Sequence, residues 1–103
     1  KEGVPFIAPY SASKAGVIAF SKALAKEVVQ DGVTVNCIAS AMAETELMRE
    51  MTPEHIASMK AKIPMGRFVR IDEIAEMVAF VASPKCSFTT GFTFDLTGGR
   101  ATY

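Results

Sequence analysis

Apolar positions along the chain recur with a helical period in some stretches and form short unbroken runs in others. The longest helical pattern extends from about Tyr10 to Val29 and contains two apolar stripes. One stripe consists of Val17, Phe20, Leu24 and Val28, and the other consists of Ala12, Ala15, Ala19 and Ala23. A helix that is apolar on more than one face is usually buried on more than one side. We therefore expect this helix to have two neighbours.

The remaining elements alternate between strand and helix patterns. A loop is expected over Lys1–Pro9, since Pro9 disfavours helical geometry at the residue before it. Gly32 is expected to cap the long helix in the left-handed conformation. Val33–Ala39 is a short β-branched run that fits a buried parallel strand. An irregular, then weakly helical stretch follows over Ser40–Met51.

Two shorter helices and a second strand follow. Thr52 supplies a capping hydroxyl before Pro53, and the apolar face of this helix consists of Ile56, Met59 and Ile63. A further helix is expected to start at Asp72 and to end before Ser83, with an apolar face at Ile74, Met77, Val78 and Val81. Phe92–Leu96 predicts the last strand, which Gly98 and Gly99 stop.

The order strand, crossover helices, strand favours a βαβ unit and hence an α/β fold with a parallel sheet. Two strands are too few for a stable sheet of this kind. Half of the 103 residues are apolar, whereas a short chain should be more polar than average. The sequence therefore predicts one side of a larger sheet, with part of its apolar surface covered by something outside the chain.

Composition excludes several functional classes. Eleven basic and eleven acidic residues cancel, so no net field favours nucleic acid or an anionic membrane. No apolar run reaches the roughly 20 residues that span a bilayer, and no signal peptide is recognisable. Cys37 and Cys86 form neither a disulfide framework nor a zinc site, and Cys37 is expected to be a buried thiol. A reducing cytoplasm is the expected compartment.

Tyr10 and Lys14 are the sharpest chemical feature. They are four positions apart on a helix and so share one face. An adjacent ammonium favours the phenolate form of a tyrosine, which can then donate or accept a proton. On spacing alone, an ordinary pair on a solvated helix face remains the alternative.

The residues around this pair resemble the short-chain dehydrogenase/reductase family. The run Tyr10–Val17 is similar to its Y-x-x-x-K signature, and Val33–Ala39 to the strand that follows its catalytic helix. Further matches follow in the family's order, at Glu44–Glu46, Ile63–Phe68, Asp72–Ala75, Thr90–Gly91, Asp95 and Gly98–Gly99. The resemblance covers nearly the whole chain.

The resemblance implies the C-terminal portion of a Rossmann-like, doubly wound parallel sheet, with hydride transfer to or from NAD or NADP. Tyr10 would be the proton donor to a ketone or the base for an alcohol, and Lys14 would lower its pKa and bind the nicotinamide ribose. Ser40, Ala41 and Thr45 are the other implied cofactor contacts, and no metal is implied. Ser40–Ala41 replaces the family's usual Pro-Gly.

The family's glycine-rich phosphate loop and catalytic serine match no residue here. Residues 1–103 are therefore expected to be the C-terminal catalytic and substrate-binding part of a single Rossmann-like domain, inactive by itself. A 3-oxoacyl thioester reductase is one common role in the family, and no residue selects that substrate. The alternative is a catalytically incomplete chain that only associates with partner subunits. The parent protein is expected to be a homodimer or homotetramer. One stripe of the long helix can cover the sheet, so the other needs a partner, which places Ala19 and Ala23 close to an interface, and the resemblance points the same way.

Three smaller features allow more than one interpretation. Five of the six methionines lie in the stretch 42–65, as lining of a substrate loop or as core of two short helices. The single histidine, His55, is expected to be a solvated surface residue. Arg67 and Arg70 are expected to be surface charges, or to form salt bridges with Asp72 or Glu73, rather than to bind phosphate.

Overall fold

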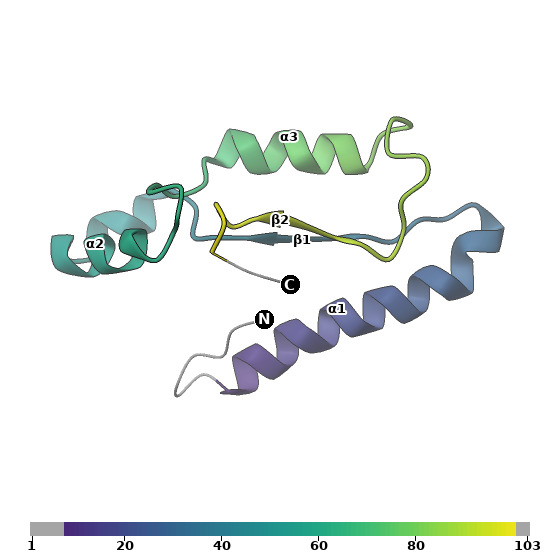
Figure 1. Ribbon diagram of the computed structural model, residues 1–103, viewed down its shortest axis with the longest axis horizontal. Coiled ribbons are helices and arrows are strands. Elements are labelled where there is room, and N and C mark those ends of the chain that lie inside the picture. Colours follow the sequence, from purple (N-terminus) through teal and green to yellow (C-terminus); the bar gives the residue numbers. More distant parts are fainter. Residues whose placement is uncertain (1–7, 101–103) are drawn as a thin grey trace.

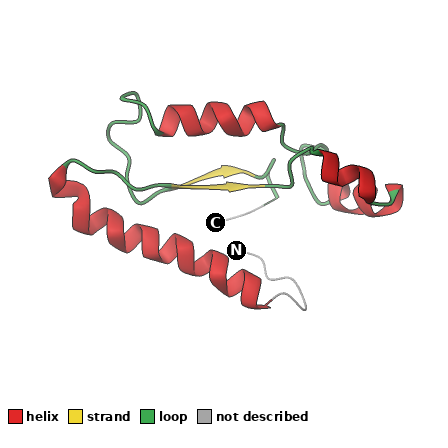
Figure 2. Cartoon of the chain, turned by 180° about the vertical axis from the view of Figure 1, so that it is seen from behind, coloured by secondary structure: helices red, strands yellow, loops and turns green. Residues whose placement is uncertain are grey.

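The fold is a small parallel sheet with a helix on each face, in a computed structural model that describes residues 8–100. The elements follow in the order α1 (Ala8–Val28), η1 (Val29–Asp31), β1 (Cys37–Ser40), η2 (Glu46–Glu50), α2 (Pro53–Ala61), α3 (Ile71–Val81) and β2 (Thr93–Leu96). Helix α1 lies against one face of the sheet and α3 against the other (Figure 1). Helix α2 lies beyond the carboxyl ends of both strands, as the view from behind also shows (Figure 2).

The two strands pair in parallel, with Cys37 opposite Thr93 and Ser40 opposite Leu96. Parallel strands need a long crossover connection, which here contains η2, α2 and α3. The predicted βαβ unit and α/β class are thus confirmed.

The first strand is shorter than the sequence predicted, because residues 33–36 are bonded in a different way. The Asn36 side chain donates to the Thr89 carbonyl oxygen at 3.2 Å and accepts from the Phe92 N–H at 3.0 Å. The Val35 N–H donates to the Thr90 hydroxyl at 3.0 Å. Side-chain groups therefore interrupt the ladder before Cys37, where a backbone bond joins the Gly91 N–H to the Val35 carbonyl oxygen at 2.7 Å. The β-branched run Val33–Ala39 forms a strand only in its last part.

The first helix starts earlier than predicted, at Ala8, and includes Pro9 in its first turn. Proline is tolerated there because the first N–H groups of a helix have no partner within the helix. Gly32 adopts the predicted left-handed conformation, with φ of 78°, and its N–H donates to the Val29 carbonyl oxygen. The last predicted helix begins at Ile71, one residue before Asp72.

The two apolar stripes of α1 match its packed face only in part, because Leu24 and Val28 of the first stripe are half-buried while its other members are exposed. Val17 and Phe20 are 57% and 67% exposed, and the alanine stripe from Ala12 to Ala23 is exposed as well. The residue that packs most tightly is Ala25, which is 1% exposed and lies under Gly91. The periodicity predicted the helix correctly, but the choice between its faces depends on where the 90–91 turn approaches it.

The best-buried apolar cluster lies at the end of the sheet rather than beneath it. Met48, Ile63 and Phe68 form its centre, and Ile56 and Met59 of α2 pack against it, as the predicted apolar face requires. Met51 also packs there, whereas Met42 and Met65 are exposed. Most methionines of the 42–65 stretch therefore fill this core. Within residues 8–100, no helix is long and apolar enough to cross a membrane.

Gly98 joins this cluster to the end of β2. It has a φ of 64°, and its carbonyl oxygen accepts from the Met65 N–H at 3.0 Å. A Cβ atom at Gly98 would lie 2.7 Å from Cγ2 of the buried, β-branched Ile63. The turn can therefore approach the strand end this closely only because residue 98 has no side chain.

We predict that Gly98→Ala lowers the free energy of unfolding more than Gly66→Ala does. Gly66 also has a positive φ but has open space around it, so its substitution costs only backbone strain, about 1–2 kcal/mol. The clash with Ile63 adds a further loss of about 1–3 kcal/mol at Gly98. Urea unfolding of the two variants measures the difference, and equal losses would show that Ile63 moves aside without cost.

Candidate active site

Tyr10 and Lys14 are placed one turn apart on α1. The backbone of both residues is helical, which gives them the spacing that the sequence predicted. The side chain of Tyr10 lies outside the part of the chain that the structure describes. Lys14 is exposed and lines a cavity, so the position of the pair is set by the N-terminal half of α1 beside the sheet.

The cavity beside Lys14 has a volume of about 530 Å³. It lies between α1 and β1 and brings three of the predicted site residues together, namely Lys14, Ser40 and Ala41. Its volume falls within the range of small-molecule sites, about 300–1,000 Å³. In α/β sheets, ligands bind at the carboxyl ends of the strands, and this cavity extends to that end of β1.

Ser40 and Ala41 are placed at the cavity by the sheet itself. Ser40 is the last residue of β1 and is exposed. The Ala41 N–H continues the parallel ladder by donating to the Leu96 carbonyl oxygen at 3.1 Å. Ala41 also packs against the Met48 cluster, so the protein accommodates a methyl group at this position.

Thr45 lies in a different hollow, of about 570 Å³, which it shares with Met48 and Phe68. It precedes η2 in an extended conformation, and its hydroxyl does not cap that helix. Among the described side chains, the structure thus brings Lys14, Ser40 and Ala41 together and leaves Thr45 on the adjoining segment.

Sequence reasoning missed two residues that line the cavity beside Lys14. Ile18 lies one turn after Lys14 on α1, and Thr93 lies opposite Cys37 on β2. The i, i+4 spacing from Lys14 could have identified Ile18 as part of the same face. Thr93 could not be found in this way, because its place beside the cavity depends on the register between the two strands.

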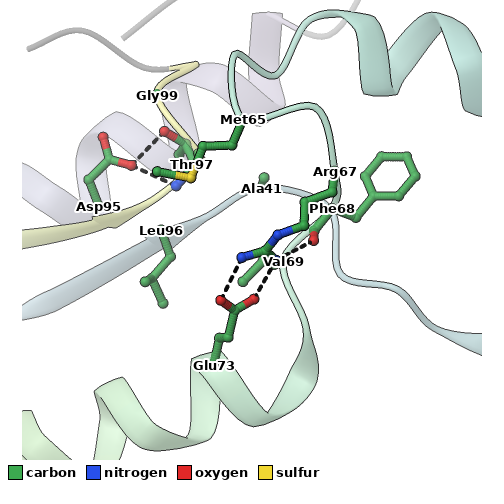
Figure 3. A pocket seen from close by; sticks show the side chains of 11 residues that line it. Ala41, Met65, Arg67, Phe68, Val69, Glu73, Asp95, Leu96, Thr97 and Gly99 are labelled. Carbon is green, nitrogen blue, oxygen red and sulfur yellow. Dashed lines mark hydrogen bonds and ion pairs between the residues drawn. The ribbon is translucent and has the colours of Figure 1, made fainter.

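A third cavity, of about 310 Å³, lies where the two strand ends meet the turn before α3 (Figure 3). Asp95 accepts a 2.7 Å hydrogen bond from the Thr97 N–H at one side of it. At the other side, Arg67 donates two hydrogen bonds to the Glu73 carboxylate, at 2.7 and 2.9 Å. This fork-to-carboxylate geometry is the strongest form of ion pair between side chains.

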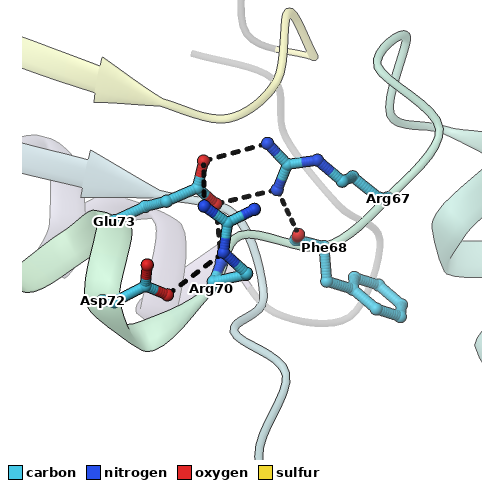
Figure 4. A network of polar contacts seen from close by, with 5 residues as sticks. All are labelled: Arg67, Phe68, Arg70, Asp72 and Glu73. Atoms are coloured by element: carbon cyan, nitrogen blue, oxygen red, sulfur yellow. Dashed lines mark hydrogen bonds and ion pairs between the residues drawn. The ribbon is translucent and has the colours of Figure 1, made fainter.

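Glu73 is the centre of a larger network at the start of α3 (Figure 4). The Arg70 N–H also donates to its carboxylate at 2.9 Å, and Arg70 pairs with Asp72 at 3.1 Å. The hydrogen bonds from Arg67, and then that from the Arg70 backbone, lower the pKa of Glu73 from 4.5 to about 2. The predicted surface ion pairs of Arg67 and Arg70 are therefore confirmed.

The other candidate residues have structural roles. His55 is exposed, as predicted, and its backbone N–H donates to the capping Thr52 hydroxyl at 3.1 Å. Both cysteines are free; Cys86 is buried, whereas Cys37 is only half-buried, contrary to expectation, since it lines the cavity beside Lys14. Within residues 8–100, no group of three or more metal-ligating side chains could hold a metal ion.

These features define an α/β protein with a ligand-sized cavity at the carboxyl edge of a parallel sheet. The family model described as Enoyl-(Acyl carrier protein) reductase matches residues 1–101. The chain belongs to the short-chain dehydrogenase/reductase family, and its fold matches the C-terminal part of the Rossmann fold of that family.

Two curated relatives and one solved structure give the scale of the similarity. The 2-dehydro-3-deoxy-L-rhamnonate dehydrogenase (NAD(+)) of Sphingomonas sp. is 48% identical over the whole chain. The 3-oxoacyl-[acyl-carrier-protein] reductase FabG of Salmonella typhimurium is 45% identical over 89% of it. An actinorhodin polyketide ketoreductase variant with NADPH superimposes on 99% of the chain, with a TM-score of 0.89 and 37% identity. The chain spans 41%, 38% and 43% of these proteins, respectively.

We predict a specific acid dependence for the stabilising effect of Glu73. Its pKa in the folded chain lies below the ordinary value, so its contribution is complete above about pH 4.5 and is lost as the pH falls through about 2. The difference in free energy of unfolding between the wild type and Glu73→Gln should therefore be constant near neutral pH and shrink on acidification. Urea unfolding across this pH range measures it, and a difference that grows in acid would contradict the assignment.

Proposed function

We propose that the protein carrying this chain is an NAD(P)-dependent oxidoreductase that interconverts an alcohol and a ketone. In this proposal the chain is the C-terminal catalytic part of one Rossmann-like domain. The observation that carries it is the shared cavity of Lys14, Ser40 and Ala41 at the carboxyl end of β1, in a chain of this family.

Proton transfer is the proposed role of Tyr10. Its phenol would donate a proton to the oxygen of a ketone or accept one from an alcohol. The Lys14 ammonium, one helical turn away, would favour the phenolate and so bring the pKa of Tyr10 closer to neutral pH. The rigid helix keeps the two groups at this spacing, which supports a joint role.

The residues at the strand end fit a nicotinamide cofactor. Lys14 and Ser40 offer polar groups in a cavity whose lining is otherwise largely apolar. Such a lining suits the nicotinamide group, which is a flat ring that carries a polar carboxamide. When bound, the nicotinamide supplies or accepts the hydride. Tyr10, Lys14, Ser40, Ala41 and Thr45 are the proposed contacts. The Sphingomonas relative is named as using NAD(+), and the ketoreductase was solved with NADPH, so the relatives support either cofactor.

The proposed substrate is a small-molecule alcohol or ketone. The relatives are named as acting on 2-dehydro-3-deoxy-L-rhamnonate, which is a small molecule, and on 3-oxoacyl groups, which are ketones carried by an acyl carrier protein. Reduction of a 3-oxoacyl thioester fits the proposal. The two free thiols fit a reducing compartment such as the cytoplasm.

The second candidate function is subunit association by a catalytically incomplete chain. The large exposed side chains of α1, Val17 and Phe20, favour it, since they form an apolar face that a partner could cover. Cofactor binding separates the two candidates, because only the oxidoreductase requires it.

We predict that Tyr10→Phe removes most turnover in a chimera in which the N-terminal part of the Sphingomonas dehydrogenase precedes residue 1 of this chain. The substitution deletes only the proposed proton carrier, and such groups contribute about 10²- to 10⁴-fold. Steady-state rates of nicotinamide oxidation measure the loss, and an unchanged midpoint of thermal unfolding is the control for folding. Turnover close to that of the unmodified chimera would rule out Tyr10 as the acid or base.

We predict that Lys14→Met in the same chimera lowers activity and moves the pH optimum upward. The phenol of Tyr10 then lacks the neighbouring positive charge and ionises only at higher pH. Rate profiles against pH measure the shift. Lys22→Met is the matched control, because Lys22 lies two turns further along α1 and contacts the Gly91 carbonyl oxygen instead of the cavity. An unmoved optimum in Lys14→Met would contradict the proposed role.

The parent protein is further proposed to be a homodimer or homotetramer with the alanine stripe of α1 at an interface. Ala19 and Ala23 are exposed, and small residues let two helices approach closely. We predict that Ala19→Arg shifts the chimera toward monomer, because a bulky charge would stand between the helices. Light scattering measures the mass. Gln30→Arg adds the same charge just beyond the helix and should leave the assembly unchanged, whereas an unchanged mass in Ala19→Arg would refute this interface.

A further inference from the structure

The segment that leads from β1 to Thr45 has few attachments of its own. After Ala41 it leaves the sheet, and it is next held by Val69, which pairs with Ala43 in an isolated parallel bridge. The Glu44 N–H donates to the Val69 carbonyl oxygen at 3.1 Å. Val69 is buried, with 8% of its surface exposed. Its contacts with Ala43 and Glu44 therefore join the segment Ala43–Thr45 to the packed part of the chain.

Val69 in turn is held by the ion pair between Arg67 and Glu73. One Arg67 nitrogen that binds the Glu73 carboxylate also donates to the Phe68 carbonyl oxygen at 3.2 Å. Glu73 also accepts a hydrogen bond from the Arg70 N–H. It is therefore bonded to the residue before Phe68 and to the residue after Val69. Figure 4 shows Arg67 and Arg70 converging on Glu73, with the Phe68 carbonyl oxygen beside the Arg67 guanidinium.

We propose that Arg67 and Glu73 are positioning residues that hold the Ala43–Thr45 segment in place for cofactor binding. The inference rests on the proposed function, in which Thr45 is a cofactor contact. The pair acts through Val69: the ion pair fixes the turn, the turn presents the Val69 carbonyl oxygen, and that oxygen fixes Glu44 next to Thr45.

The neighbouring pair of Arg70 and Asp72 provides a matched control. It lies at the same end of α3, but its side chains are 53% and 63% exposed, and the Asp72 carboxylate bonds to the Arg70 side chain. In the Arg67–Glu73 pair the side chains are 48% and 26% exposed, and two hydrogen bonds join them instead of one. Exposed ion pairs usually contribute little, so Asp72→Asn should leave the segment unaffected.

The first test is amide hydrogen exchange at Glu44 in the chimera, with Arg67→Lys, Arg67→Met, Glu73→Gln and Asp72→Asn. In Arg67→Met and Glu73→Gln we expect Glu44 to exchange about three- to tenfold faster, since a charge-assisted fork is lost. Arg67→Lys keeps the charge but not the fork and should fall in between. The ladder amide of Cys37, which donates to the Phe92 carbonyl oxygen at 2.8 Å, should not change. Unchanged exchange at Glu44 overturns the proposal.

The second test is cofactor affinity and the division of the kinetic effect in the same variants. We expect the dissociation constant and KM for NADH or NADPH to rise about three- to tenfold in Arg67→Met and Glu73→Gln. The kcat at saturating cofactor should stay close to that of the chimera, since Tyr10 and Lys14 are untouched. Faster exchange at Glu44 without loss of affinity would overturn the positioning role. Failure of the unmodified chimera to bind either cofactor would instead contradict the proposed function.

Discussion

The parallel pairing of β1 with β2 is the constraint on which the other contacts depend. It joins residues more than 50 positions apart in the chain, and it begins with the Asn36 side chain, which bonds to both Thr89 and Phe92. Because parallel strands run in one direction, the pairing places Ala41 and Thr97 at the same edge. The connection between the strands must then pass across one face, where α3 lies, while α1 covers the other (Figure 1).

This edge is assembled from three segments that are separate in the chain. Backbone hydrogen bonds join Ala41 to Leu96, Glu44 to Val69 and Met65 to Gly98. Each bond ties a different pair among the end of β1, the turn before α3 and the end of β2. The candidate cofactor segment therefore has a defined position although it contains no long helix or strand, and the Met48 cluster packs beneath it.

The apolar surface of the chain is divided unevenly between this edge and the sheet. The cluster around Phe68 is buried within the chain, whereas Phe20 of α1 and Phe92 beside β2 stay more than half exposed. An apolar fraction of one half in so short a chain is consistent with this distribution. Either further strands and helices of the same domain or a second subunit could cover these side chains. The proposed function requires the further part of the domain.

Local rules were sufficient for the features that depend on neighbouring residues. The capping hydroxyl of Thr52, the left-handed Gly32 and the apolar face of α2 follow from spacing and side-chain type, and the structure has them where the sequence placed them. The Tyr10–Lys14 spacing, and the family resemblance built around it, likewise came from the sequence. Contacts over long distances did not. The length of β1 depends on Asn36 meeting Thr89, and the packed face of α1 depends on Gly91 approaching Ala25. Thr93 lines the cavity through strand register, and the backbone of Ala43 and Glu44 is bonded to Val69. Such choices are made by partners dozens of residues away, and periodicity within one segment carries no information about them.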